Sequence, residues 1–439
     1  MLVHSGTFDV ANYGDLLFPL LLQKRLGAVP LVHVSPAGGP PVWTGCVSST
    51  SFEELLGKPV AGLVIGGGNI IHAMPSKLPD YENAGVDLTG YGDLWVCSAL
   101  SVDASIPVIW NAPGVAGRFE TASIDIVRRA LRRVNYLSVR DNASRDCLLE
   151  VDPDLEVAVV PDSAWALPKL WEQAELDASF AVLMNRLGNS PLEPIVTIHV
   201  NARYMKGIKI ESVAENIDRI CEALEARPLF IAIGPCHGDD VTAVEVAQLC
   251  RSRPLILDKP ESLIEIAAVI SHSEFYMGSS MHGYITAASF GVPAVAVARG
   301  KFKFDGVVQL TGAPETLISS WEEAPEIFAE IDRKALGEKF KAVSANAQGQ
   351  LDKHWSRIVA LLAQRESVEP PLTDKTAFYR SRTELLSSLA RHYRTLHDEA
   401  KESLKRAEKR QFARASAKEP AKKPVSLFER WTKAMRKDV

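Results

Sequence analysis

The residues whose types and spacing could do chemistry are concentrated in the segment 274–298. Its pattern of apolar and polar residues predicts a strand over 274–277, a tight turn over 278–283, a helix over 284–290 and a second strand over 294–298. A helix that starts directly after such a turn presents unpaired backbone N–H groups, which suit a phosphate or a carboxylate. The segment therefore predicts an anion-binding site.

Four residues of the predicted turn could serve such a site. Ser279 and Ser280 offer hydroxyl groups, and Gly283 allows the backbone to come close to a ligand. His282 is the titratable side chain of the turn and can exchange a proton near neutral pH. His282 could instead only cap or pack the start of the helix, but its place between a serine-glycine turn and a helix favours a functional role.

Polar and glycine-rich clusters follow other predicted strands as well. Asn12 and Asp15 open the first long helix, where they could cap it or hydrogen-bond a sugar hydroxyl. Gly67, Gly68 and Asn69 follow an apolar strand, so their amides could cradle a ligand. Because the ligands of open α/β sheets bind beyond the C-terminal ends of the strands, these clusters favour one shared cleft.

Cationic residues follow two strands in the second half of the chain. Arg203 comes after the predicted strand 195–200 and would place a fixed positive charge at the cleft. Arg299 and Lys301 follow the strand 294–298 and would add charge to the same rim. Each of them could also be an ordinary solvated surface residue. Their coincidence with the serine-histidine turn favours an anionic ligand.

The composition is that of a globular protein with an unequal charge distribution. The 439 residues are 46% apolar and 23% charged, which suggests two or three domains. From Leu372 onward 18 Lys and Arg face 9 Asp and Glu, a balance of +9, so the net charge of −5 leaves −14 for the preceding residues. The six cysteines are scattered without metal-ligand spacing, so we expect free thiols and no metal site. The sequence shows no signal-peptide pattern and no apolar run of about 20 residues, which predicts a cytoplasmic protein.

Short apolar strands alternate with helical patterns in two tandem series, which predicts mostly parallel sheets. The stretch between the two series, 167–192, lacks clear periodicity. We therefore predict an α/β fold of two Rossmann-like, doubly wound domains that face a cleft. The strands of the first series are expected at 2–4, 31–34, 60–65, 106–110, 136–139 and 157–160, and those of the second at 195–200, 229–233, 255–257, 274–277 and 294–298. The predicted parts of the chain are an N-terminal domain at 1–175, a C-terminal domain at 190–330, a helical return at 331–368 and a basic helical or disordered tail at 372–439.

Several short motifs occur in the order and spacing of a known family. They are Asn12-x-Gly14-Asp15, Gly66-Gly-Gly68, Val139-Arg-Asp141, Val160-Pro-Asp162, Ser279-Ser-Met-His282-Gly283 and Gly291-Val-Pro293. Over residues 1–310 the chain resembles the polysaccharide pyruvyl transferase family. The resemblance implies a two-domain fold like glycosyltransferase B. It also implies transfer of the enolpyruvyl group of phosphoenolpyruvate onto two hydroxyls of a saccharide as a cyclic ketal, in exopolysaccharide or cell-surface glycan synthesis. Phosphoenolpyruvate is then a donor substrate, and no cofactor is implied.

The resemblance further implies roles for individual residues. The motif histidine corresponds to His282, which we expect to act as a general acid or as an imidazolium that stabilises the phosphate. Asp15 or Asp162 would deprotonate or orient the acceptor hydroxyl. The N-terminal domain would hold the saccharide acceptor, and the residues expected to contact it are Asn12, Gly67, Gly68, Asn69 and Asp162.

The C-terminal domain would hold the donor. Many family members carry Arg two residues before the motif histidine, where this chain has Ser280. Another cation would then have to supply that charge, because phosphoenolpyruvate carries both a carboxylate and a phosphate. The candidates for this charge are Arg203, Arg299 and Lys301. The full set of expected donor-binding residues is Arg203, Ser279, Ser280, Gly283, Arg299 and Lys301.

Two other functions are compatible with the same motifs. A nucleotide-sugar glycosyltransferase of the same architecture would need an acidic residue to contact the ribose, and the helix 283–291 contains no Glu. An inactive saccharide-binding relative is the second alternative, and Ser280 is the feature that suggests it. The donor that binds distinguishes the three functions: phosphoenolpyruvate, a nucleotide sugar, or neither.

The tail carries two predicted helices beyond Pro370 and Pro371, which are expected to end the globular part. Residues 375–412 predict a long helix with leucines along one side, which could pair with a second copy in a homo-oligomer. Residues 425–437 predict a short basic amphipathic helix that could lie on an anionic membrane surface or dock on a partner. Such an anchor would suit a lipid-linked saccharide acceptor at the inner face of the plasma membrane. The acidic body and the lack of a known nucleic-acid-binding motif argue against nucleic acid as a partner.

Overall fold

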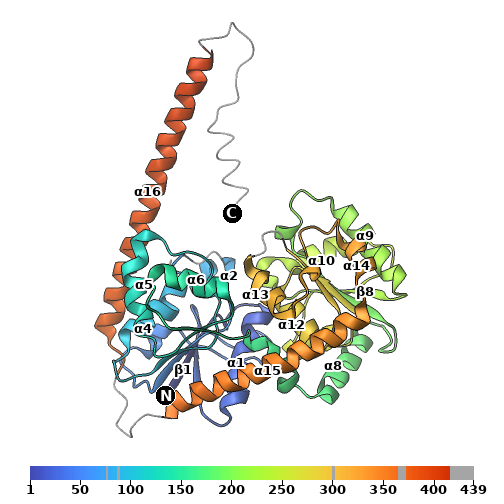
Figure 1. The fold of residues 1–439 in the computed structure, drawn as a ribbon, viewed down its shortest axis with the longest axis horizontal. Coiled ribbons are helices and arrows are strands. Elements are labelled where there is room, and N and C mark those ends of the chain that lie inside the picture. The colour runs from blue at the N-terminus through green and yellow to red at the C-terminus, as the bar shows by residue number, and fades with distance from the viewer. Residues whose placement is uncertain (76–77, 87–88, 299–301, 364–371, 416–439) are drawn as a thin grey trace. The chain divides into compact units, whose positions relative to one another are not determined.

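The computed structural model describes residues 1–75, 78–86, 89–298, 302–363 and 372–415. The chain forms one compact unit, Met1–Leu385, and a second unit that begins at Leu386. The compact unit contains a four-stranded and a six-stranded parallel sheet, each accompanied by helices, and a further parallel pair of strands beside the first (Figure 1). The prediction of an α/β fold with two Rossmann-like sheets is therefore confirmed.

The first sheet is built from β1 (Leu2–Ser5), β2 (Leu31–Val34), β3 (Gly62–Ile65) and β4 (Val108–Trp110), and is followed by β5 (Leu137–Val139) and β6 (Val157–Val159). Its strand order is β2-β1-β3-β4, with all neighbours parallel. A parallel bridge between Ile109 and Tyr136 joins the parallel pair β5-β6 to β4. The direction in which strands are added therefore reverses between β1 and β3.

Three longer helices accompany this sheet, namely α1 (Tyr13–Leu26), α5 (Ile124–Leu131) and α6 (Asn142–Val151). Asn12 caps α1, because its side-chain oxygen accepts a hydrogen bond from the backbone N–H of Gly14 at 3.2 Å. The capping role considered for Asn12 is thus realised. The shorter helical segments of this half are η1 (Phe52–Leu55), α2 (Pro79–Asn83), α3 (Gly90–Gly92), η2 (Asp93–Cys97), α4 (Ser98–Ser101), η3 (Thr121–Ser123), η4 (Ser163–Ala166) and α7 (Leu167–Leu170).

The second sheet is built from β7 (Ile195–His199), β8 (Arg227–Ile231), β9 (Leu255–Leu257), β10 (Phe275–Gly278), β11 (Ala294–Val297) and β12 (Leu317–Ile318). All its strands are parallel, in the order β12-β11-β10-β7-β8-β9. Counted from β7, this is the 3-2-1-4-5-6 order of a Rossmann fold, and it reverses between β7 and β10. The apolar runs in the sequence therefore predict every strand of the two series except β12, which has only two residues.

The stretch 167–192, for which the sequence pattern predicts no element, contains α7 and a long helix, α8 (Gln173–Arg186), so this prediction is wrong. The buried stripe of α8 is Leu176, Phe180, Leu183 and Met184. Exposed Val182 lies within the same turns and obscures the helical period of that stripe. The remaining helices of this half are η5 (Ala202–Tyr204), α9 (Ile210–Ala223), η6 (Pro235–His237), α10 (Asp239–Ala247), α11 (Leu263–Ser271), α12 (Met281–Ser289), α13 (Phe302–Thr311), η7 (Pro314–Thr316) and α14 (Ala324–Glu330).

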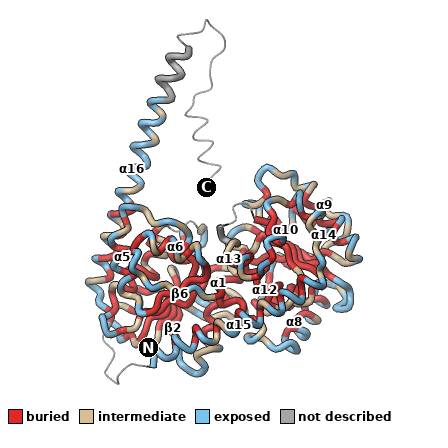
Figure 2. Tube along the Cα trace, viewed as in Figure 1, coloured by how far each residue is buried: buried red, intermediate tan, exposed pale blue. Residues whose placement is uncertain are grey.

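A long helix, α15 (Arg333–Ala363), ties the two halves of the compact unit together and realises the predicted helical return (Figure 1). It packs on α12 in the second half and on η4 in the first. Near its end, Trp355 Nε1 and His354 Nε2 both donate to Asn111 Oδ1, each at 3.1 Å, directly after β4. One apolar cluster includes buried residues of both halves, and Figure 2 shows the buried segments meeting between the sheets. The two sheets therefore share a core.

The last helix, α16 (Lys375–Ala415), begins inside the compact unit. Phe378 and Leu385 on its first turns belong to the apolar core of the first half. The compact unit consequently continues to Leu385, beyond the end predicted at 370–371. In the second unit the described part is the continuation of this helix, and the predicted helix at 425–437 lies outside the described residues. None of the described helices combines the length and apolar character that a bilayer crossing needs.

Acid should weaken the contact between α15 and the first sheet. The hydroxyl of Tyr136 donates to His354 Nδ1 at 2.9 Å, so the ring is held in its neutral form. Burial, followed by the charge of Arg357, lowers the pKa of His354 from 6.5 to about 4. Between pH 6.5 and about pH 4 the unfolded chain binds a proton at His354 that the folded chain does not. The free energy of unfolding therefore falls as the pH falls through this range. We expect the free energy of unfolding, measured in urea, to fall between pH 7 and pH 4.5. His354 should account for about 2–3 kcal/mol of this decrease.

The matched variant is His354→Gln, whose amide can still donate to Asn111 but does not titrate. Its free energy of unfolding should depend less steeply on pH than that of the wild type. The remaining slope has identifiable sources, because burial also lowers the pKa values of His33 and His72 to about 4. Equal slopes in the two proteins would show that His354 does not contribute to the acid sensitivity.

Candidate functional site

A cavity of about 270 Å³ lies where the C-terminal ends of the two sheets meet. Its walls come from the loops after β1, β3 and β5 in the first sheet and after β7, β8 and β10 in the second. It thus lies at both points where the strand order reverses, which is where open α/β sheets bind ligands. The lining residues are Thr7, Asn12, Asp15, Asn69, Ile70, Leu78, Tyr91, Arg140, His199, Asn201, Arg203, Tyr204, Ile233, Gly234, His237, Asp239, Ser279, Ser280 and His282.

Most of the side chains predicted for the site come together in this cavity. Four predicted residues do not line it but support residues that do, as described below. Two further predicted residues, Arg299 and Lys301, lie outside the described residues. The predicted residues on the cavity wall are Asn12, Asp15, Asn69, Arg203, Ser279, Ser280 and His282. The supporting ones are Gly67, Gly68, Asp162 and Gly283.

His282 stands in the first turn of a helix and not in a turn before it. The prediction of a turn over 278–283 is wrong in this respect, because α12 already begins at Met281. Ser280 caps the helix, with its hydroxyl accepting from the backbone N–H of Gly283 at 3.2 Å. The ring of His282 is buried and meets the edge of Phe18 at 5.5 Å between centroids. Its Nε2 points toward a carboxylate oxygen of Asp162, 3.7 Å away.

The motif glycines make room for side chains of the site. A Cβ on Gly14 would lie 1.9 Å from His282 Nδ1, so only glycine lets α1 approach this ring. Gly67 and Gly68 have φ values of +88° and +74°, and a Cβ on Gly68 would lie 2.4 Å from Asp15 Oδ1. A Cβ on Gly283 would lie 2.0 Å from the hydroxyl oxygen of Tyr276. These glycines therefore shape the cavity wall and do not line the cavity themselves.

Asp162 lies beneath the cavity and joins His282 to a buried arginine. It caps η4 by accepting from the backbone N–H of Ala164 at 3.0 Å, and its other oxygen lies 3.4 Å from Arg140 Nη1. Burial by itself would raise the pKa of Asp162, but the proximity of His282 and the charge of Arg140 outweigh it and lower the pKa below its usual value. Asp162 is therefore an anion, and it offers a carboxylate oxygen to Nε2 of His282 above it.

Arg140 is a site residue that was not included in the predicted set. Its Nη2 donates to Asn69 Oδ1 at 3.2 Å, and this contact fixes the orientation of the Asn69 amide at the cavity wall. Arg140 also lines a second, neighbouring cavity of about 250 Å³, together with Asp162. The signal that could have revealed Arg140 is its position directly after β5, within the motif Val139-Arg-Asp141.

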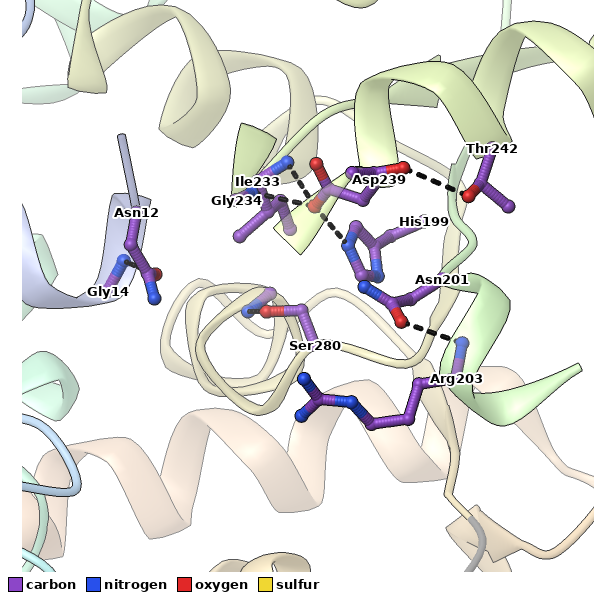
Figure 3. A network of polar contacts seen from close by, with 12 residues as sticks. Asn12, Gly14, His199, Asn201, Arg203, Ile233, Gly234, Asp239, Thr242 and Ser280 are labelled. Atoms are coloured by element: carbon purple, nitrogen blue, oxygen red, sulfur yellow. Dashed lines mark hydrogen bonds and ion pairs between the residues drawn. The ribbon is translucent and has the colours of Figure 1, made fainter. Parts of the chain in front are cut away.

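A buried pair, His199 and Asp239, forms part of the wall on the second sheet and was also missing from the predicted set (Figure 3). His199 Nε2 lies 2.8 Å from Asp239 Oδ2. The same oxygen accepts from the backbone N–H groups of Ile233 at 3.1 Å and Gly234 at 2.6 Å. The two residues lie 40 positions apart in the sequence, so no local pattern brings them together.

Arg203 provides the exposed cation of the cavity. Asn201 caps the short helix η5 by accepting from the backbone N–H of Arg203 at 3.0 Å, which fixes where the arginine leaves the chain. Figure 3 shows the guanidinium of Arg203 extending toward the turn at Ser280. Among the described residues Arg203 forms no ion pair, so its charge is available to an anionic ligand.

Several polar atoms around the cavity have no hydrogen-bond partner within the described part of the chain. Buried polar groups are normally paired, and leaving one unpaired costs about 1–3 kcal/mol. Their convergence on one cavity indicates a ligand with several polar groups. The unpaired atoms on the wall are Thr7 Oγ1, His199 Nδ1, Asp239 Oδ1 and Ser279 Oγ. No group of three or more His, Cys, Asp or Glu within the described ranges could hold a metal ion.

Comparison with solved structures supports the fold. The UDP-GlcNAc 2-epimerase of Neisseria meningitidis bound to UDP-GlcNAc aligns with a TM-score of 0.51 and 12% identity, over 83% of this chain and 99% of the epimerase. MnaA of S. aureus in complex with UDP aligns with a TM-score of 0.51 and 11% identity, over 84% and 99% of the two chains. At these identities the similarity concerns the fold alone. A search of curated protein sequences gives no match.

The sequence itself matches a family model. The model describes polysaccharide pyruvyl transferases, and the match covers residues 12–301. This range contains all the cavity residues from Asn12 to His282, including those that sequence motifs alone did not reveal. Because the match extends over more than half of the 439 residues, this chain belongs to the polysaccharide pyruvyl transferase family.

Proposed function

We propose that this protein transfers the enolpyruvyl group of phosphoenolpyruvate onto two hydroxyls of a saccharide as a cyclic ketal. The observation that carries the proposal is the cavity at the two strand-order reversals. There a cation, a helix start and a histidine with a carboxylate partner face a set of unpaired polar atoms. Family membership gives the reaction class, and this arrangement is suited to an acidic donor and a polyhydroxyl acceptor.

The donor would bind on the wall formed by the second sheet. Phosphoenolpyruvate carries a carboxylate and a phosphate, so its site needs a cation together with N–H and O–H donors. Arg203 offers the cation, and Ser279 offers a buried hydroxyl without a protein partner. The start of α12 adds the partial positive charge of a helix N-terminus. Arg203 would thereby supply the charge that Ser280 lacks.

His282 would act as the general acid of the first step. A proton passes from its imidazolium to the methylene carbon of the donor, and the central carbon becomes an electrophile. One acceptor hydroxyl adds to that carbon and loses its proton. Phosphate then leaves, and the second hydroxyl adds to close the ketal. The ionised Asp162 beneath the ring supports this role, because its carboxylate lies 3.7 Å from His282 Nε2 and can orient the imidazole.

The acceptor would bind on the wall formed by the first sheet. Asn12, Asp15 and Asn69 offer amide and carboxylate groups of the kind that hydrogen-bond sugar hydroxyls. Asp15 would orient or deprotonate a hydroxyl. Asp162, which was predicted as an acceptor contact, is better suited to supporting His282, because it is buried beneath the ring and is absent from the wall of this cavity.

The test is a thermal-shift titration of the full chain with phosphoenolpyruvate, beside UDP- and GDP-sugars. A ligand that binds only the folded state raises the melting temperature by mass action. We expect stabilisation by phosphoenolpyruvate and not by the nucleotide sugars, and loss of this shift in Arg203→Ala. Arg219→Ala, which removes an exposed arginine from α9, is the matched control and should keep the shift. Stabilisation by a nucleotide sugar alone would favour a glycosyltransferase instead, and no shift with any donor would favour a saccharide-binding relative.

Turnover is tested by phosphate release from phosphoenolpyruvate, with a panel of p-nitrophenyl hexosides that have free 4- and 6-hydroxyls as acceptors. We expect His282→Ala and His282→Gln to lower the rate by about 10²–10⁴, the usual contribution of a general acid. Their melting temperatures should stay close to that of the wild type. Wild-type rates in either variant would exclude His282 from the chemistry, and ketal formation itself is followed by the mass of the product.

The close approach of α1 to His282 gives a separate prediction. In Gly14→Ala the new methyl group must displace the imidazole, because its position lies 1.9 Å from Nδ1. We expect phosphate release to fall by about 10²-fold, the cost of misplacing a catalytic group by about 1 Å. Gly349→Ala is the matched control, because Gly349 also lies within a helix but has open space around it. This control should keep full activity and gain about 0.5–1 kcal/mol of stability. Equal activity in the two variants would contradict the prediction.

A further inference from the structure

We propose that His199 is a second acid–base residue of this site, one that begins each turnover as a base while His282 begins it as an acid. The proposal rests on the proposed pyruvyl transfer and adds a residue to it. The observations that carry it are the position of His199 in the sheet, its partner Asp239, and an unpaired ring nitrogen on the cavity wall.

His199 is the last residue of β7, at the reversal point of the second sheet. In the register of β7 and β10 it lies opposite Gly278, the residue that leads into the serine-histidine turn. The backbone N–H of Ser279 donates to the carbonyl oxygen of His199 at 3.1 Å. His199 ends β7, and His282 lies in the helix that follows the adjacent strand β10. The two histidines therefore line the same cavity.

Asp239 fixes the protonation pattern of the His199 ring. One oxygen of Asp239 takes three donors: the ring Nε2, and the backbone N–H groups of Ile233 and Gly234. Because this oxygen accepts from both backbone N–H groups, it acts as an acceptor toward the ring as well. The proton of a neutral His199 consequently lies on Nε2, and Nδ1 carries the lone pair. Nδ1 is buried and makes no hydrogen bond within the described protein, so it is the atom left to meet a substrate hydroxyl.

Ketal formation needs a base as well as an acid. The first step adds a proton to the methylene carbon and removes one from the attacking hydroxyl, and one imidazole cannot do both at once. The carboxylate of Asp162 lies 3.7 Å from His282 Nε2, an arrangement that suits the acid. His199 presents a lone pair, which suits the base. The two histidine–aspartate pairs thus match the two proton transfers of the step.

The proton balance closes over a full turnover. His282 gives its proton to the methylene carbon, while His199 Nδ1 takes the proton of the first hydroxyl as the new C–O bond forms. His199 then returns that proton to the bridging oxygen as the bond from the central carbon to the phosphate oxygen breaks. The second hydroxyl adds to the same carbon and gives its proton to His282. Both histidines end in the state in which they began, and the products are the ketal and hydrogen phosphate.

The other ionisable groups near His199 come from several elements. Those on the wall of the same cavity are Asp239 from α10, Arg203 and Tyr204 from η5, His237 from η6, His282 from α12, Asp15 from α1, Tyr91 from α3 and Arg140 after β5, and the hydroxyl of Tyr276 lies beside Gly278. Of these, Asp239 is in hydrogen-bond contact with the His199 ring. Asp239 acts on the substrate only through His199 and is therefore a positioning residue.

The experiment compares the pH dependence of kcat/KM for phosphate release from phosphoenolpyruvate, with water and the p-nitrophenyl hexoside panel as hydroxyl sources. The wild type should give a bell-shaped profile, because one histidine must be neutral and the other charged. His199→Gln keeps an amide donor for Asp239 and removes the base. It should lower kcat/KM by about 10²–10⁴ and lose the acidic limb, while calorimetric affinity for phosphoenolpyruvate changes only a few-fold.

Two further variants separate catalysis from structure. Asp239→Asn should lower kcat and change KM for phosphoenolpyruvate only a few-fold, because the His199 ring loses the acceptor that holds Nδ1 toward the substrate. His272→Gln is the control: His272 Nε2 also pairs with a carboxylate, Asp177, at 2.9 Å, but the pair is outside the cavity. This control should keep the full profile and rate.

The outcomes distinguish the two proposals. A wild type that neither binds phosphoenolpyruvate nor releases phosphate from it overturns the proposed function and the present inference together. An active wild type whose His199→Gln variant keeps the acidic limb, or loses activity only through KM, overturns this inference alone. If His199→Gln melts well below the wild type, nitrogen-15 spectra of the histidines in the wild type decide the matter. The proposal requires a neutral His199 protonated at Nε2 whose Nδ1 signal shifts when phosphoenolpyruvate and a hexoside are added together, and an Nδ1-protonated ring or an unmoved signal overturns it.

Discussion

The first turn of α1 joins the two sheets, and the geometry of the cavity depends on this join. The backbone N–H of Tyr13 donates to the carbonyl oxygen of Ile233 at 2.8 Å, just beyond β8. The hydroxyl of Tyr13 lies 3.1 Å from the hydroxyl of Thr286 on α12. Burial raises the pKa of Tyr13, so this hydroxyl stays protonated and able to donate. Gly14 follows at once and lies against the ring of His282. A helix cap in the first half thereby sets the position of a histidine in the second.

The two histidine–aspartate pairs depend on this join to different degrees. His199 and Asp239 both belong to the second half, and two backbone N–H groups of the loop after β8 hold the carboxylate in place. Asp162 belongs to the first half, where Ala164 and Arg140 hold it, whereas His282 belongs to the second. The first pair would survive a separation of the two halves, and the second exists only while they are joined. The contact between His282 and Asp162 therefore depends on the docking of the two sheets.

Much of the fold and part of the site could be predicted from local patterns. Buried parallel strands appear in the sequence as short apolar runs. His282 and Arg203 each follow such a run, so both were correctly placed at one cleft. Asp239 could not be predicted as a partner of His199, because the loop after β8 and the start of α10, distant in sequence from β7, bring the carboxylate to the ring. Gly67 and Gly68 were predicted to offer their amides to a ligand, but they are glycines because the side chains of Phe18 and Asp15 pass close by. A sequence pattern shows that the backbone needs space, and the fold determines what occupies that space.

Position 280 illustrates how a site can keep its charge when one residue changes. Ser280 caps α12 through its hydroxyl, a role that an arginine side chain at this position would not fill, because arginine has no hydrogen-bond acceptor. The cation of the cavity comes from η5 instead, where Asn201 caps the short helix and directs Arg203 toward the Ser280 turn (Figure 3). Coulomb attraction depends on where a charge is located and not on which strand supplies it. Because β7 and β10 are adjacent in the sheet, a residue that follows one strand can serve a ligand held at the end of the other. The order of the strands therefore allows a positive charge at this cavity to come from either loop without moving the cavity.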